Sequence, residues 1–493
     1  MNMVIRNPER SGSKRISIAG LIGLIGVVGA LLAGCTVGPQ FERPTPPAPS
    51  VWHVTPGDGT SDVTTAAIDE TWWTHFQDPE LDSLVQRLVR QNLDLASASE
   101  RVIEAQAARR VTASAGMPNV GASVSQAHER VSATGTSTLV SHPPGAPLEY
   151  NDWSAGLSAS WELDLFGRVR RAVEAADAGS AAADEARRGV ALDALAELAD
   201  DYMTLRGAQA RAAIVQRNLD TATHSLTLVE NQYANGIGNT LDVARAKATR
   251  ESIAALLPDL QTTQQQSINA IGLLLAQPPR ALQGELAPVK NLPLLPPSVP
   301  AGLPSALLRR RPDIREAEAR LHEATAQTGV AVASFYPDVS LTGSVGTEGL
   351  QFGNLFGLPS RAFSIGPSID IPIFEGGRLR GMLKLRRAQQ REAAIAYQKT
   401  VLQAWRDVDN AMTAYGNTQR RRSDLAQAVD HDRTALAAAT QRYQQGSSSY
   451  LEVDSAQSAL LTGEDHLVQA DMALRQQLVA LYKALGGGWS VVG

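Results

Sequence analysis

The residue whose surroundings most clearly suggest a chemical role is the chain's one cysteine, Cys35. It follows Leu32-Ala33-Gly34 and closes an uncharged stretch, residues 16–34, which itself follows a basic segment. A basic start, an apolar middle and small residues at the end are typical of a secretory signal, and a cysteine at that end is typical of a bacterial lipoprotein. The thiol of such a cysteine accepts a diacylglyceryl group. Cys35 is therefore predicted to be the lipidated first residue of the mature chain.

The apolar stretch allows one alternative. Its 19 residues are just long enough for an uncleaved transmembrane helix, but a helix gives no reason for a cysteine with small residues before it. The lipoprotein interpretation leaves no free thiol, and one cysteine allows no disulfide within the chain. Thr36 stands where an aspartate usually retains lipoproteins at the inner membrane. We therefore expect a lipid-anchored protein of the outer membrane that extends into the periplasm.

Other motifs that could do chemistry are missing from the sequence. The eight histidines are scattered, no His-Glu-x-x-His or cysteine pair offers a metal site, and no glycine-rich loop before a helix could hold a phosphate. The net charge of −5 gives no reason to expect a nucleic-acid partner. The sequence therefore predicts no metal and no cofactor apart from the covalent lipid. An enzyme is the weakest of the alternatives, because no site supports it.

The distribution of proline indicates two very long helical regions. Proline is missing between Pro147 and Pro258 and again from Ile373 to the end, and helix interiors exclude proline because it lacks the N–H and clashes with the preceding turn. Residues 168–233 could therefore form one helix of roughly 100 Å at 1.5 Å per residue. Apolar residues within this stretch follow the three-four spacing of a coiled-coil seam, as at Leu192, Leu195, Ala199 and Tyr202.

The two halves of the chain repeat each other. Seven residues of the first half recur 219 positions later: Asp94, Arg101, Glu104, Ala105, Val111, Pro118 and Val120 match Asp313, Arg320, Glu323, Ala324, Val330, Pro337 and Val339. Further on the offset is 210, where Tyr233, Gly236, Leu241 and Val243 match Tyr443, Gly446, Leu451 and Val453. The second offset is constant across the long helices, so the two helical hairpins should have equal lengths. The sequence thus predicts a duplicated unit of one helix, two strands and a helical hairpin.

Each repeat contains two stretches that alternate between apolar and small polar residues with the period of a β-strand. The apolar positions are Val120, Ala122 and Val124; Trp153, Ala155, Leu157, Ala159, Trp161, Leu163 and Leu165; Val339, Leu341 and Val345; and Phe363, Ile365, Pro367, Ile369, Ile371 and Ile373. Strands of about ten residues with this alternation are typical of the wall of a transmembrane β-barrel.

A soluble sheet with one buried face would show the same alternation. Two features favour the membrane. Trp153 and Trp161 lie on the apolar face, as interfacial aromatic residues do, and the helices are committed to coiled coils, which leaves the apolar face without a partner. Four strands cannot close a barrel, and lipid does not tolerate an open sheet edge. Three copies would supply twelve strands, so the sequence predicts a homotrimer in contact with outer-membrane lipid.

Five motifs occur in a fixed order along the chain: Cys35-Thr36-Val37-Gly38-Pro39; Trp72-Trp73 with Phe76, Asp78 and Pro79; Trp161-Glu162-Leu163-Asp164-Leu165-Phe166-Gly167; Arg311-Pro312-Asp313-Ile314-Arg315; and Leu481-Tyr482-Lys483-Ala484-Leu485-Gly486-Gly487-Gly488-Trp489. With these motifs the sequence resembles the outer-membrane factors of tripartite, RND-type efflux pumps, of the TolC and OprM type, and in particular their NodT-like lipoprotein branch. The resemblance covers the mature chain almost from end to end.

The resemblance implies an internally duplicated fold of α-helices and membrane β-strands. A trimeric twelve-stranded transmembrane β-barrel, with four strands per chain, would continue into a long periplasmic α-helical coiled-coil barrel. It also implies an exit channel for small molecules, with a periplasmic adaptor protein and an inner-membrane RND-type pump as partners. The residues alone leave a second function open, a lipid-anchored periplasmic coiled-coil structural or adaptor protein, although adaptors typically carry a lipoyl-like β-domain.

Together these observations predict how the chain is divided. The predicted parts are a lipoprotein signal peptide (1–34), a lipidated N-terminal segment with an equatorial region (35–92), the first repeat (93–277), a Pro-rich equatorial linker (278–305), the second repeat (306–485) and a C-terminal tail (486–493).

Each long helix must reverse its direction at a glycine, because glycine adopts the left-handed conformation that ends a helix. Gly236 and Gly446 stand at the two reversals. Together with Ile237 and Ser447, which follow them, they are the predicted hairpin tips and the candidate contacts for the adaptor.

In proteins that this sequence resembles, apolar and acidic side chains at the second tip narrow the periplasmic end of the pore. The resemblance therefore implies a gate at Leu451, Glu452 and Asp454. Leu451 matches the family's apolar constriction residue, but Asp454-Ser455 stands where the family often has Leu-Asp, so the acidic ring falls on Glu452 or on Asp454. Rings of carboxylates attract cations and repel anions. The alternative is that both carboxylates are solvated helix residues.

Overall fold

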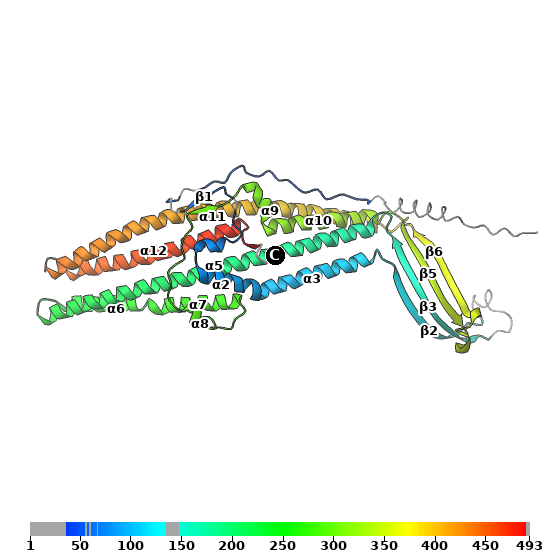
Figure 1. Cartoon of the computed structure of the whole chain (residues 1–493), viewed down its shortest axis with the longest axis horizontal. Helices are drawn as coiled ribbons and strands as arrows, with labels where there is room; N and C mark the ends of the chain where they lie inside the picture. Colours follow the sequence, from blue (N-terminus) through cyan, green and yellow to red (C-terminus); the bar gives the residue numbers. More distant parts are fainter. Residues whose placement is uncertain (1–35, 55–56, 59–60, 67, 135–146, 490–493) are drawn as a thin grey trace, which may run out of the picture. The chain divides into compact units, whose positions relative to one another are not determined.

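The computed structural model describes residues 36–54, 57–58, 61–66, 68–134 and 147–489 (Figure 1). Cys35 and the predicted signal peptide therefore lie outside the described residues. The chain divides into two compact units. The first unit contains the chain up to Glu42 with residues 107–177 and 322–391, and the second contains residues 43–106, 178–321 and 392–493. Both units therefore draw on both halves of the chain.

The first unit is built around a four-stranded antiparallel sheet whose strands lie side by side in Figure 1. Across the sheet their order is β2 (Asn119–Arg130), β3 (Glu149–Leu163), β5 (Asp338–Gly349) and β6 (Arg361–Asp370). All four alternating stretches are strands, as predicted. Leu165, Ile371 and Ile373 lie beyond the strand ends, contrary to the prediction. The chain turns there, through the left-handed Gly167 (φ 83°) and at Pro372, which has no N–H for the ladder.

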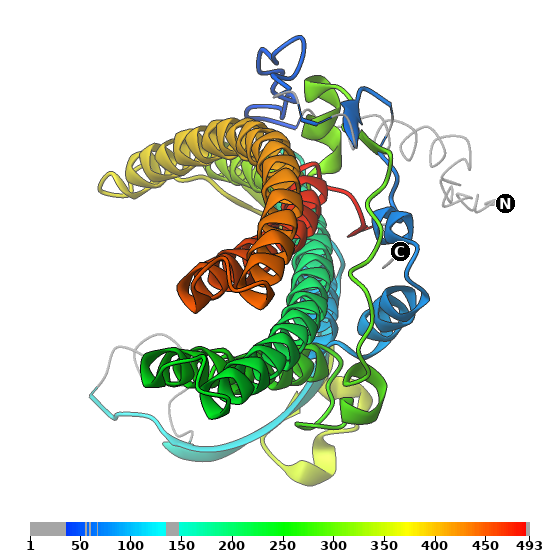
Figure 2. The ribbon, with the colours of Figure 1, turned by 90° about the vertical axis from the view of Figure 1, so that its left-hand side faces the viewer.

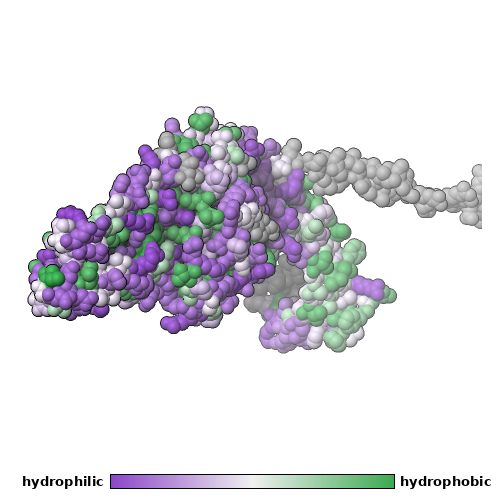
Figure 3. Space-filling view, turned by 60° about the vertical axis from the view of Figure 1, so that its left-hand side comes forward, coloured by the Kyte–Doolittle hydropathy of each residue, from purple (hydrophilic) through white to green (hydrophobic). Residues whose placement is uncertain are grey.

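The register of the sheet places the apolar residues of all four strands on one face. Leu157 lies opposite Ala122 on β2 and Val345 on β5, and Val345 lies opposite Phe363 on β6. This face is uncovered, since Val124 and Phe363 are 80% and 83% exposed. Hydrophobic residues gather over the sheet in Figure 3. The apolar face is therefore complete in the chain but has no covering layer within the described residues.

Helices precede and follow each strand pair in the same order. α3 (Leu93–Ser114) leads into β2, and α10 (Pro312–Ala333) leads into β5. After the strands come α5 (Arg168–Ala234) and α11 (Arg378–Gln444), 67 residues each, which match the predicted equal lengths. The return arms are α6 (Thr240–Ala254) with α7 (Leu257–Leu274), and α12 (Tyr450–Ala484). The first return arm breaks where Pro258 enters, because proline is tolerated in the first turn of a helix and not inside it.

In the second unit each long helix packs beside its return arm, α5 beside α6 and α11 beside α12 (Figures 1 and 2). Among the described residues, no helix is both long enough and apolar enough to cross a membrane. The main core of this unit lies where η1 (Trp72–Phe76) and α2 (Pro79–Gln91) pack against the long helices. There Trp72 stacks on Tyr482 at 5.2 Å between ring centroids and donates its Nε1–H to the carbonyl of Gly487.

The remaining elements of the chain are short. β1 (Asp62–Thr64) and β4 (Ser298–Pro300) form a parallel pair in the second unit. Between α7 and α10 lie α8 (Gln283–Leu286), η2 (Pro304–Ala306) and α9 (Leu307–Arg310), and the β5–β6 connection contains η3 (Phe352–Asn354) and η4 (Leu358–Ser360).

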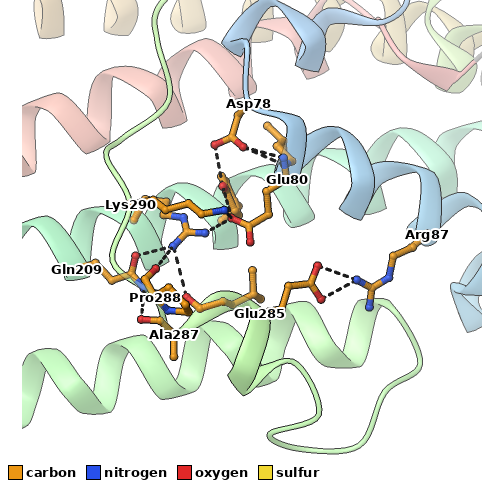
Figure 4. A network of polar contacts seen from close by, with 12 residues as sticks. Asp78, Glu80, Arg87, Gln209, Glu285, Ala287, Pro288 and Lys290 are labelled. Carbon is orange, nitrogen blue, oxygen red and sulfur yellow. Dashed lines mark hydrogen bonds and ion pairs between the residues drawn. The ribbon is translucent and has the colours of Figure 1, made fainter.

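A buried polar network ties the linker to α2 and α5 (Figure 4). The guanidinium of Arg206 on α5 is fully buried and donates to the carboxylate of Glu80, to Gln209 and to the carbonyl of Pro288. Lys290 also donates to Glu80, at 3.0 Å. A buried charge needs such partners, because desolvation without them costs several kcal/mol. This network therefore fixes the position of the linker against α2 and α5.

Candidate functional site

The two helix reversals have the same backbone structure. After α5, the left-handed Gly236 donates its N–H to the carbonyl of Tyr233, and Ile237 donates to Gln232, at 3.0 Å each. After α11, Gly446 donates to Tyr443, and Ser447 donates to Arg442, again at 3.0 Å. This is the Schellman motif, which satisfies the last carbonyls of a helix and requires a residue with positive φ. The two glycines therefore end the helices as predicted.

The tip residues differ in what they offer to a partner. Ile237 is 80% exposed at the first tip, where an apolar side chain is open to solvent. At the second tip Ser447 is also exposed, but its side chain is polar, and its hydroxyl donates to the carbonyl of Arg442. The second tip therefore has less apolar surface to offer than the first.

An apolar cluster lies just behind the tips and joins four helices. Leu226 and Val229 of α5, Ala246 of α6, Tyr443 of α11, and Tyr450 and Val453 of α12 are its buried members. The two tyrosine rings meet edge to face with centroids 5.6 Å apart, an arrangement that adds to the burial energy. Burial, and after it the charge of Asp454, raises the pKa of Tyr450 to about 12. The cluster thus connects the two hairpins close to the predicted gate.

The predicted gate residues lie in the first turns of α12. Leu451 is 47% exposed, so its side chain is available to meet copies of itself. Glu452 accepts a hydrogen bond from Arg442 at 3.0 Å, and both side chains are about half exposed. The charge of Glu452 is thus compensated within its own hairpin. Such an exposed pair contributes only about 0.2–1 kcal/mol.

Asp454 has a different partner. Its Oδ1 accepts a hydrogen bond of 2.6 Å from the hydroxyl of Thr249 on α6, so this carboxylate connects the second hairpin to the first. Thr249 is neutral, and among the described residues no lysine or arginine forms an ion pair with Asp454. The uncompensated negative charge next to Leu451 therefore belongs to Asp454.

The polar face of the sheet is lined by hydroxyl groups. Ser158, Ser344 and Ser364 form one row across β3, β5 and β6. With their neighbours they border an open hollow of about 400 Å³. The residues that line this hollow are uncharged: Asn119, Gly121, Ser158, Ala159, Ser160, Thr342, Gly343, Ser344 and Ser364. Such a surface can be wetted and offers hydrogen bonds without selecting for charge.

The two edges of the sheet are β2 and β6, and within the described residues neither pairs with a further strand. β2 runs away from α3, and β6 runs back toward α11. An unpaired edge presents a row of free N–H and C=O groups, which is a template for another strand. Because the two edges run in opposite directions, the β2 edge of one chain can pair antiparallel with the β6 edge of another.

A cluster of carboxylates lies on α5 beside the core of the second unit. Burial is the main cause that raises the pKa of Asp201, to about 6, and the charges of Glu197 and Asp200 add to it. Burial also raises the pKa of Asp200. Among the described residues, however, no group of three or more His, Cys, Asp or Glu side chains is arranged to hold a metal ion.

The partners of the predicted gate carboxylates were not identified from the sequence. Arg442 precedes Glu452 by ten residues across the turn, and its place in the last turn of α11 was the available signal. Thr249 is separated from Asp454 by 205 residues, and nothing in the local sequence of α6 pointed to it. The sequence leaves the predicted acidic ring open between Glu452 and Asp454, and these two residues differ in their partners.

The chain is similar to known proteins along most of its length. Residues 84–277 and 303–487 match the family model described as outer membrane efflux protein. The solvent efflux pump outer membrane protein SrpC of Pseudomonas putida is 32% identical over 471 residues, which cover 94% of this chain and 97% of SrpC. The cation efflux system protein CusC of Escherichia coli is 30% identical over 466 residues, 94% and 98% of the two chains. Among solved structures, the outer-membrane channel OprN is 35% identical with a TM-score of 0.84, and the match covers 92% of this chain and all of OprN.

Proposed function

The chain belongs to the outer membrane efflux protein family, and we propose that its four-stranded sheet is one third of a barrel wall through which small molecules leave the cell. The protein is an outer-membrane efflux channel that extends into the periplasm and works with a periplasmic adaptor and an inner-membrane pump. Its role is transport. We infer that it carries out no catalysis and needs no cofactor other than the lipid on Cys35.

Three properties of the four-stranded sheet support this proposal. Its apolar face is open along all four strands, its opposite face is lined by hydroxyls, and both of its edges lack partners within the described residues. A sheet with these properties is unstable alone in water and in lipid, because water penalises the apolar face and lipid penalises the unpaired edges. Three copies joined edge to edge remove both penalties and leave a polar lumen.

A cysteine scan tests the edge pairing directly. Ser123→Cys on β2 is combined in turn with single cysteines along β6, and interchain disulfides are then measured. If β2 of one copy pairs with β6 of the next, disulfides should form at positions on the same face, such as Ser364, Gly366 and Ser368. Ile365, on the opposite face, is the matched control. Disulfides without this period of two, or confined to one chain, would contradict edge closure.

The periplasmic end of the channel is the second part of the proposal. We place the gate at the first turn of α12, where three copies of Leu451 form an apolar constriction and three copies of Asp454 form the acidic ring. The compensated pair of Glu452 with Arg442 supports this choice, because that pair has no net charge. The hydrogen bond from Thr249 to Asp454 would hold the two hairpins together while the gate is closed.

Single-channel recording in planar bilayers tests the gate. Asp454→Asn should reduce the preference for cations, measured as the reversal potential under a salt gradient. The matched control is the double variant Arg442→Gln, Glu452→Gln, which keeps the net charge and should keep the parental selectivity. The difference should fade as salt rises from about 0.1 M to 1 M, since the Debye length falls from about 10 Å to about 3 Å. Leu451→Ala should widen the pore and raise its conductance. If the Asp454→Asn channel keeps the parental preference for cations, Asp454 does not form the acidic ring of the gate.

The hairpin tips form the third part of the proposal. Gly236 and Gly446 end the long helices with the same motif, which leaves Ile237 and Ser447 at the extreme of each hairpin. We propose that the adaptor contacts the channel there, and that the 80% exposed Ile237 contributes the apolar part of the contact. Ile237→Asp should weaken binding of the purified adaptor to the trimer, whereas the trimer itself should assemble normally.

A further inference from the structure

The connection between β5 and β6 folds into a compact loop with an apolar surface. Its chain turns through η3 and η4, and the hydroxyl of Ser360 donates to the carbonyl of Asn354 at 2.7 Å. Leu355, midway along the loop, is only 2% exposed. Four large apolar side chains around it are open to solvent, each between 59% and 73% exposed: Leu350, Phe352, Phe356 and Leu358. Exposed apolar patches of this kind mark sites of contact with a partner or a membrane.

The loop is continuous with the apolar face of the sheet. The ring of Phe352 lies edge to face against Trp153 of β3, with centroids 5.1 Å apart, and Phe356 lies edge to face against Phe352 at 6.4 Å. Trp153 is on the same face as Leu157, because side chains of a strand alternate between its faces. A lipid layer that covers this face would therefore reach the loop as well.

The two tryptophans of β3 indicate the depth of the loop in the membrane. Trp153 and Trp161 are eight residues apart on the apolar face, which is about 27 Å along a strand and about 20 Å of depth at a tilt of about 40°. The apolar band of an outer-membrane barrel is about 25 Å tall and has aromatic residues at both edges. Trp161 is the nearer of the two to α5, and β5 and β6 are joined to helices at that end. Trp153 and the loop therefore belong to the outer leaflet.

One cation on the apolar face has no partner. Arg361 begins β6 opposite Thr347, two residues before Phe363, so the alternation of the strand places it on the same face as Phe363. It is exposed, and within the part of the chain that the structure describes its guanidinium forms no ion pair or hydrogen bond. Another arginine on this face, Arg130 of β2, is paired with Glu149. At the edge of the apolar band the charge of Arg361 is therefore free to meet an anion.

We propose that Arg361 and the loop around Phe352 and Phe356 form a binding site for a phosphorylated lipid of the outer leaflet. The guanidinium presents parallel N–H donors that match two oxygens of one phosphate, and the apolar loop lies beside the acyl chains. A phosphate with no cation of its own leaves a charge for Arg361 to bind, which a zwitterionic headgroup does not. Three copies of the site would surround the barrel and fix its height in the membrane. The proposal rests on the barrel wall proposed above.

Binding of lipid A to the purified trimer tests the site. Diphosphorylated lipid A is titrated onto the trimer in detergent and followed by native mass spectrometry, and the same lipid without its phosphates is the control probe. Arg361→Gln removes the cation. Arg380→Gln is its matched control, because Arg380 is exposed on α11, beyond the opposite end of the sheet. Phe356→Ser removes an apolar side chain of the loop, and Gln351→Ser, at an exposed polar position of the same loop, is the control for it.

Arg361→Gln should weaken binding of the phosphorylated probe by about 10- to 150-fold, the effect of losing a hydrogen bond to a charged group. It should leave binding of the dephosphorylated probe unchanged. Phe356→Ser should weaken both probes by about four- to tenfold, as expected when half of the burial energy of a phenylalanine is lost. Both control variants should bind the two probes as the parent does. Excess inorganic phosphate should not displace the lipid, because phosphate alone gains nothing from the loop.

Two outcomes would overturn the site and leave the barrel intact. One is equal affinity of the parent and Arg361→Gln trimers for the phosphorylated probe. The other is displacement of the lipid by inorganic phosphate, which would mean that the headgroup alone is bound. The same spectra report whether the chain is a trimer, so a parent protein that forms no trimer would refute the barrel, and the site with it.

Discussion

Replacing Leu157 with arginine places a charge in the middle of the apolar face of the sheet. Leu157 is 52% exposed on β3 and is flanked on that face by Ala122 and Val345. If the face meets lipid, the guanidinium must either enter the hydrocarbon or distort the bilayer around it. Ser158 is the matched control, because it is the next residue on the same strand and points to the hydroxyl-lined face.

The free-energy cost of Leu157→Arg follows from the position of residue 157 near the middle of β3. Arginine on the lipid face of a barrel costs about 2–4 kcal/mol near the bilayer midplane. For one copy this corresponds to a change of about 30- to 700-fold in the equilibrium constant for insertion, at 1.4 kcal/mol for each factor of ten. Three copies enter one barrel, so the total is roughly 6–12 kcal/mol per trimer. In Ser158→Arg the new side chain should point into the water-filled lumen and so avoid this cost.

The assay is the fraction of chain that runs as a heat-labile trimer in the outer-membrane fraction. Total protein is measured on heated samples, so that reduced synthesis is not mistaken for failed assembly. Leu157→Arg should reduce the trimer strongly, and Ser158→Arg should leave most of it. Equal trimer in the two variants would refute the assignment of the faces and favour a sheet with water on both sides.

Three further predictions concern other parts of the chain. Cys35→Ala should abolish fatty-acid labelling and processing at that position, and label retained in this variant would refute lipidation. Arg206→Ala should destabilise the second unit by up to about 3–5 kcal/mol, because Glu80 loses its buried cation and keeps only the half-exposed Lys290; Arg87→Ala, which breaks the more exposed pair with Glu285, should cost at most about 1 kcal/mol, both measured by thermal unfolding followed by circular dichroism. The pKa of Asp201, raised to about 6, means that the folded chain holds this proton more tightly than the unfolded chain, so stability falls as the pH rises from about 4 through 6. Asp201→Asn should therefore raise the melting temperature at about pH 7 and leave it nearly unchanged at about pH 4, and an equal shift at both values would exclude this titration as the cause.

The sequence by itself determined the elements and their order. Exclusion of proline predicted the long helices, and α5 ends within one residue of the predicted position at Tyr233. The alternation of apolar and polar residues predicted all four strands and their two faces, because successive side chains of a strand point to opposite faces whatever lies around it. The positions of Gly236 and Gly446 predicted both helix reversals, because glycine has no Cβ and adopts positive φ readily whatever its neighbours are. Each of these signals is local, so no knowledge of distant neighbours was needed.

Only the tertiary structure decided which side chains act together. Glu452 and Asp454 are two residues apart and looked equivalent, but Arg442 compensates the first and Thr249, 205 residues away, holds the second. Gly329 is a helix residue by its sequence, and its use becomes visible only where the backbone of Gly38 lies against it. Contacts of this kind depend on where separate helices meet, and that is set by the packing of the whole chain, which leaves no periodic trace in the sequence.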